Sequence, residues 1–109
     1  MALSDQSTNG AVAATETTII TGNAAGTLIK AGAVTITNDT AGTTSNLQVG
    51  VIKAGGSRVN MLNYDMQPAS TWVNDGDIIL EDATDSLVAI AADAATLTYT
   101  ASYFDDFLA

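Results

Sequence analysis

The sequence predicts an all-β protein: an antiparallel, jelly-roll-like β-sandwich of about eight short strands with an extended N-terminal arm. Short runs rich in Thr, Val and Ile recur along the chain, and several alternate apolar with polar residues, as half-buried strands do. Gly, Asn and Asp separate the runs and favour turns, and no capping box precedes the Ala-rich stretch 89–95 that would otherwise suggest a helix. The predicted strands lie at 17–21, 27–30, 34–37, 47–52, 59–62, 71–73, 78–80, 87–92 and 96–103.

Two parts are expected in the chain: an extended N-terminal arm, residues 1–14, and a β-sandwich domain, residues 15–109. The arm consists mainly of small and polar residues, with Leu3 and Val12 as its bulky aliphatic side chains. It shows neither helical nor strand periodicity. Because it is so poor in apolar residues, we expect it to be ordered only where its own domain or a neighbouring subunit holds it.

The composition argues against an enzyme. The chain contains no cysteine and no histidine, so it lacks the commonest general base, the usual partner of a nucleophilic serine and any thiolate ligand for a metal. Hydrophobic residues make up 47% of the chain and charged residues 14%, which predicts a folded rather than a disordered protein. We expect no catalytic residue, no cofactor and no metal.

The net charge of −9 limits the partners that the protein can bind. The positive residues are Lys30, Lys53 and Arg58, too few to neutralise the phosphates of a nucleic acid or an anionic membrane surface. Residues 1–5 lack the basic start and apolar run of a secretory signal, and no stretch approaches the ~20 apolar residues of a membrane helix. We therefore expect synthesis in the cytoplasm, no nucleic acid, no membrane, and partners that are basic or of mixed charge.

Two features leave a binding module open as an alternative. The loop 74–77 contains Asp75 and Asp77, and oxygen-rich loops of this kind can bind calcium, although the spacing is not that of an EF-hand. Turn residues of this type also serve simply to end strands in water. Trp72 offers a platform on which a sugar ring could stack, whereas a single tryptophan in a sandwich more often belongs to the core or to an interface.

The C-terminal end of the chain is rich in aromatic residues, which surround Asp105 and Asp106. These rings either complete the core of their own domain or form an apolar anchor for a neighbouring subunit, because aromatic residues are enriched in interface cores. The candidate partner contacts over the whole chain are Leu3, Val12, Trp72, Tyr103, Phe104, Phe107 and Leu108.

Four segments together resemble a known family. They are Ile36-Thr37-Asn38, Leu47-Gln48-Val49, Asp75-Gly76-Asp77-Ile78-Ile79-Leu80-Glu81 and Asp85-Ser86-Leu87. In this order they resemble the small β-sandwich virion proteins of tailed bacteriophages, over about residues 15–103. Thr84 stands where that family usually has a glycine before the Asp-Ser-Leu hairpin.

The resemblance implies a capsid decoration, or cement, protein. Such a protein would lie on the outer surface of the virion as an oligomer, here expected to be a homotrimer, and would stabilise the shell by bridging neighbouring major capsid proteins. No catalytic residue comes with the resemblance. A tail, connector or head-fibre component is the alternative within the same class of virion structural proteins.

Overall fold

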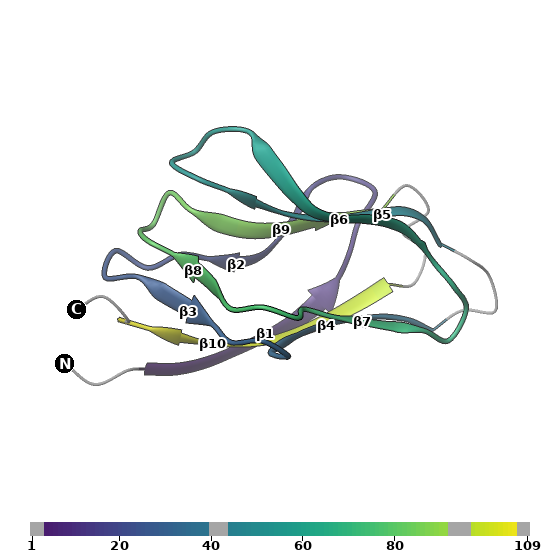
Figure 1. Ribbon diagram of the computed structural model, residues 1–109, viewed down its shortest axis with the longest axis horizontal. Coiled ribbons are helices and arrows are strands. Elements are labelled where there is room, and N and C mark those ends of the chain that lie inside the picture. The colour runs from purple at the N-terminus through teal and green to yellow at the C-terminus, as the bar shows by residue number, and fades with distance from the viewer. Residues whose placement is uncertain (1–3, 40–43, 92–96, 107–109) are drawn as a thin grey trace.

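The structure is a computed structural model that describes residues 4–39, 44–91 and 97–106, and these residues form ten strands and no helix. Two antiparallel sheets lie in two layers with the core between them (Figure 1). The strands are β1 (Ser4–Ala11), β2 (Thr17–Thr21), β3 (Thr27–Ile29), β4 (Val34–Asn38), β5 (Thr44–Ile52), β6 (Arg58–Met66), β7 (Thr71–Val73), β8 (Ile78–Leu80), β9 (Ser86–Ile90) and β10 (Leu97–Asp105).

The six-stranded sheet is built around β10. One side of β10 pairs with β1, and the other side pairs first with β4 and then with β3. β7 and β8 pair in turn with β4 and β3. β3 and β4 are thus two pieces of one interrupted strand, and so are β8 and β7.

A buried asparagine bridges the two interruptions, which lie side by side. The backbone N–H of Val34 donates to Asn74 Oδ1 over 2.9 Å, and Asn74 Nδ2 donates to the carbonyl oxygens of Lys30 at 3.1 Å and Gly76 at 2.9 Å. The amide therefore satisfies backbone groups that would otherwise lack the ladder bonds of a regular sheet.

The four-stranded sheet has the order β2-β9-β5-β6. When β3 with β4, and β7 with β8, are each counted as one strand, the sandwich has eight strands. One sheet then has the order β1, β10, β3–β4, β7–β8, and the other has the order β2, β9, β5, β6. Numbered along the chain, these orders are 1-8-3-6 and 2-7-4-5. This is the order of a jelly roll. The predicted all-β, antiparallel sandwich is confirmed.

The core is formed by the side chains that point inward from the two sheets. In β4, Val34 and Ile36 point inward and are fully buried, whereas Thr35 and Thr37 point outward. β2 and β9 depart from strict alternation and bury consecutive residues. The inward-facing residues of the strands form one continuous cluster of aliphatic side chains between the sheets. The largest fully buried side chains are Ile20, Ile29, Ile36, Leu47, Met66, Leu80, Leu87, Leu97, Val12, Val34, Val49 and Val88.

The described part of the N-terminal arm forms β1, although its sequence has no strand pattern. Its eight residues pair with β10 in unbroken register, from Ser4 opposite Asp105 to Ala11 opposite Thr98. Backbone hydrogen bonds to a strand that is itself anchored in the core replace the missing apolar side chains. The arm's own domain thus holds residues 4–11, and the functional division at residue 14 stays a prediction.

Candidate interaction surfaces

The described part of the chain offers no enclosed site for chemistry. It contains no cavity that would hold a small molecule, and no group of three or more acidic side chains lies close enough together to bind a metal ion. It also includes no helix that is long and apolar enough to cross a membrane. The candidate sites are therefore surfaces and strand edges.

The carboxylate of Asp77, one of the calcium candidates, is engaged within the protein. Its Oδ1 accepts a hydrogen bond from the backbone N–H of Ala31 at 2.8 Å, and its Oδ2 forms an ion pair with Lys30 Nζ at 3.2 Å. The hydrogen bond from Ala31, helped by Lys30, lowers the pKa of this carboxyl below its usual value. Asp77 thus closes the loop 74–77 against the turn after β3.

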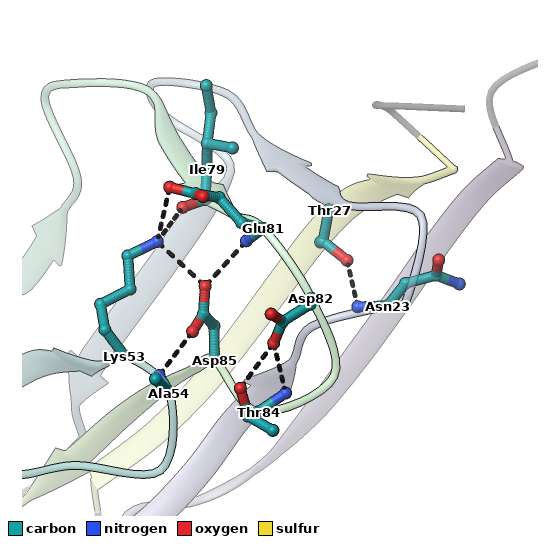
Figure 2. Close-up of polar contacts among 9 residues, drawn as sticks. All are labelled: Asn23, Thr27, Lys53, Ala54, Ile79, Glu81, Asp82, Thr84 and Asp85. Carbon is teal, nitrogen blue, oxygen red and sulfur yellow. Dashed lines mark hydrogen bonds and ion pairs between the residues drawn. The ribbon is translucent and has the colours of Figure 1, made fainter.

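Asp85 is the buried centre of a polar cluster at one end of the sandwich (Figure 2). Its Oδ1 accepts from the backbone N–H of Ala54 at 2.8 Å, and its Oδ2 accepts from the N–H of Glu81 at 2.8 Å and from Lys53 Nζ at 3.0 Å. The hydrogen bond from Ala54 first, then those from Glu81 and Lys53, lower the pKa of Asp85 to about 2. The same contact to Asp85 raises the pKa of Lys53.

The cluster, which we call the Asp85 clasp, joins the two sheets. The backbone carbonyl of Asp85 accepts from the N–H of Gly22 at 2.8 Å, so the end of β2, the turn after β5 and the end of β8 meet at one residue. A Cβ on Gly22 would lie 2.2 Å from the carbonyl oxygen of Asp82, so only glycine fits. The clasp is a structural device, because both carboxylate oxygens and the backbone carbonyl of Asp85 accept hydrogen bonds from within the chain.

The structure separates the candidate partner contacts into different environments. Val12 is 1% exposed and lies in the core, because β1 leads it between the sheets, so it is not a surface contact here. Trp72 and Tyr103 are half-buried and pack against the core, and burial raises the pKa of Tyr103. Phe104 is half-buried and points to the outer face of the six-stranded sheet. The predicted contacts that fall outside the described residues are Leu3, Phe107 and Leu108.

Phe104 belongs to a row of apolar side chains that crosses three strands. It pairs in register with Leu28 of β3, which pairs with Ile79 of β8, and all three point away from the core. Ile79 is 43% exposed and Leu28 is half-buried. We call these three residues the apolar row. Leu28 and Ile79 are not among the contacts predicted from the sequence, although each is the middle residue of a three-residue strand and so must face away from its two buried neighbours.

Most of the other residues that point outward on this sheet have hydroxyl or amide side chains, and Val73, opposite Thr35, is a 44% exposed apolar residue among them. Thr35 and Thr100 share a hydrogen bond of 2.6 Å, and Thr37 and Thr71 share one of 3.1 Å, so neighbouring strands are linked side chain to side chain. None of these groups is charged. We call this set the hydroxyl face, and its members are Ser7, Asn9, Thr35, Thr37, Thr71, Thr98, Thr100 and Ser102.

The outer face of the four-stranded sheet carries a network of charged and amide side chains instead. Arg58 reaches from β6 to Glu16 beside β2, with Nη1 2.8 Å from Glu16 Oε2. On the way its Nη2 donates to Gln48 Oε1 at 2.7 Å and its Nε donates to Asn60 Oδ1 at 2.8 Å. A Cβ on Gly50 would lie 2.6 Å from Arg58 Cγ, which shows that the arginine lies directly over the sheet. These side chains cover part of this face, and on the edge strand β6 Val59 and Met61 stay 69% and 47% exposed.

Comparisons with known proteins identify no family. No family model matches the sequence, and no curated protein matches it. One solved structure with a similar arrangement is a pentameric capsid protein isolated from metagenomic phage sequences, at 16% sequence identity and a TM-score of 0.47. The matched region covers 92% of this chain and 63% of the capsid protein, so the chain spans less than two thirds of that protein's length. A similarity of this degree says nothing about function.

Proposed function

We propose that the protein is a structural component of a bacteriophage virion, a decoration protein that binds the outside of the head and bridges neighbouring major capsid proteins. The observation that carries the proposal is the outer side of the six-stranded sheet. There the residues of the apolar row and of the hydroxyl face are all uncharged, on a protein with a net charge of −9. The ion pair of Lys30 with Asp77 lies between the two sets, and Asp5 pairs in register with Phe104 at the edge of the sheet.

An uncharged, partly apolar surface of this kind is suited to contact with another protein. Interface cores are depleted in charged residues and enriched in aromatic and aliphatic ones, as in the apolar row. The threonine hydroxyl groups of the surrounding face can donate and accept, so they can pair with polar groups of a partner when water is displaced. The acidic groups elsewhere on the chain keep it soluble before assembly.

Two further considerations support a virion role. The jelly roll is an architecture found in many viral capsid proteins, which is an analogy at the level of the fold. The turn and strand segments of the sequence also resemble the small β-sandwich virion proteins of tailed bacteriophages. We further propose that the partner is the major capsid protein and that the protein acts as a homotrimer.

The copy number of this chain in purified particles tests the proposal. Quantitative mass spectrometry against the major capsid protein should give a simple ratio set by the symmetry of the shell. A few copies per particle would move the protein to the tail, the connector or a head fibre. Absence of the chain from the particles would contradict a virion role altogether.

A further inference from the structure

The edge strands of the sandwich differ in how well they are protected against pairing with another strand. An edge strand presents unpaired N–H and C=O groups, and natural proteins usually blunt such edges with short strands, bulges or charged residues. In the described part of the chain the edges are formed by β1 and the β7–β8 pair in one sheet and by β2 and β6 in the other.

Three of these edges carry protection. β7 and β8 have three residues each and are separated by the loop 74–77. The ladder of β2 is broken by a bulge at Ile19. The ladder of β6 contains two register shifts, and the strand carries Arg58 and Asp65.

β1 has none of these devices along most of its length. It has eight residues, its register with β10 is unbroken, and it contains no lysine, arginine or proline. Its one charged residue, Asp5, is the second of the strand. No strand among the described residues pairs with its far side. β1 is thus the longest regular edge of the sandwich that is open to strand addition.

The charges around this edge indicate what would pair with it. Asp5 lies at the end of β1 near Asp105, the last residue of β10, and Asp106, which follows that strand. Asp105 Oδ1 accepts a hydrogen bond from Thr27, and neither strand contains a lysine or an arginine. The cations of the chain, on other elements, are all engaged in ion pairs. In a second copy of this chain the lysine and arginine side chains are already held in ion pairs, whereas a basic segment of another protein would complement the acidic end.

We propose that β1 is a strand-addition site, and that its occupant is an extended segment of a partner protein that pairs antiparallel to β1 and carries lysine or arginine near its C-terminal end. Antiparallel pairing places that end beside Asp5. Main-chain hydrogen bonds then provide affinity, and the acidic end provides selectivity. The proposal rests on the proposed structural role, and it names the kind of segment that the virion partner would contribute.

The test uses the full chain and synthetic peptides. The probe is acetyl-Thr-Val-Thr-Val-Thr-Val-Lys-Lys-amide, and its matched control has Glu-Glu in place of Lys-Lys. Binding is followed by backbone amide chemical shifts and by hydrogen exchange. We expect the lysine peptide to shift the amides of β1 and to slow exchange at alternate residues of that strand. The glutamate peptide should bind about tenfold more weakly, a difference that shrinks as salt is raised.

Proline variants locate the binding to the edge. N–H groups of successive residues in a strand point to opposite sides, so one of Ser7→Pro and Thr8→Pro removes a donor that faces away from β10. That variant should keep the amide spectrum of the folded domain and lose peptide binding. Val59→Ser, on the edge strand β6, is the control and should bind the peptide as the unchanged protein does.

Three results would overturn the proposal. One is a lysine peptide that leaves β1 unchanged, and another is equal binding of both peptides. The third is a dimer of the free protein in sedimentation equilibrium that the β1 proline variant dissociates, because the occupant would then be a second copy. None of these results depends on the copy number in virus particles, so failure of this inference and failure of the proposed function remain distinguishable.

Discussion

The two sheets of the sandwich differ in the side chains on their outer faces and in the regularity of their edge strands. On the four-stranded sheet, Arg58 crosses the face to Glu16 and holds Gln48 and Asn60, and the ladder of the edge strand β6 is irregular. On the six-stranded sheet, the outer face holds threonines and the apolar row, and the edge strand β1 is regular. The outer face of the four-stranded sheet is crossed by its own side chains, and the six-stranded sheet has the surface and the edge to which we assign a partner.

A comparable difference separates the Asp85 clasp from the surface that we assign to a partner. The clasp is dense in hydrogen bonds and joins both sheets, whereas the side chains of the apolar row and the hydroxyl face point away from the opposite sheet. Substitutions in the clasp should therefore change the stability of the domain, and substitutions in the row should change attachment.

The largest effect is expected from Gly22→Ala. The new methyl group would lie 2.2 Å from the carbonyl oxygen of Asp82, so the backbone of the clasp must move. We expect a loss of at least about 3 kcal/mol in the free energy of unfolding, measured by chemical denaturation. Gly76→Ala is the matched control, because a Cβ there meets no atom within 4 Å. Equal stability of the two variants would contradict the packing described for the clasp.

Asp85→Asn should have the next largest effect. The pKa of Asp85 is lowered to about 2, so this carboxylate stabilises the fold above the unfolded-state pKa of about 3.9, and the contribution is lost as pH falls through about 2. We expect a loss of about 2 kcal/mol at neutral pH. Between pH 5 and pH 2 the variant should lose less stability than the unchanged protein. If the free energy of unfolding falls equally with pH in the variant and in the unchanged protein, Asp85 does not cause the acid sensitivity.

Arg58→Ala should have a smaller effect, confined to the outer face of the four-stranded sheet. The variant loses the ion pair with Glu16 and the hydrogen bonds to Gln48 and Asn60, all near the surface. We expect a loss of about 1 kcal/mol, and less of a loss in high salt. Capsid attachment should be unchanged after correction for stability. Loss of attachment would show that the contact surface lies on the four-stranded sheet and not on the six-stranded sheet, as we propose.

The smallest effect on stability is expected from Ile79→Ser combined with Leu28→Ser in the apolar row. Both side chains face outward, so the double variant should lose no more than about 1 kcal/mol. Attachment to particles that lack the protein, measured by co-sedimentation, should nevertheless fall sharply. Val59→Ser provides the control, because Val59 is 69% exposed on the other sheet. Full attachment of the double variant would contradict the assigned surface.

Alternation and turn residues were sufficient to predict the sandwich. Val34 and Ile36 alternate with threonines in a way that a helix does not, and the predicted strands reappear in the structure as β2 to β10. β1 could not be predicted in this way, because its pairing depends on β10, which lies more than eighty residues away. A strand held mainly by backbone hydrogen bonds leaves little pattern in its own side chains.

The candidate surface was only partly predictable. Phe104 was singled out because aromatic residues gather at the end of the chain, but Tyr103 beside it packs against the core. Leu28 and Ile79 drew no attention, because a short apolar strand does not show which neighbours share a rung of the sheet. The row exists only through the register of three strands, and register follows from the whole topology.

The most direct test of the account is hydrogen exchange of this chain, free and bound to virus particles. The account predicts that binding slows exchange in β1 and in the strands that carry the apolar row, whereas β6 and the turn after β5 exchange as they do in the free protein. Protection of β6 with no change in β1 would contradict the claim that the six-stranded sheet is the side on which the protein binds its partner.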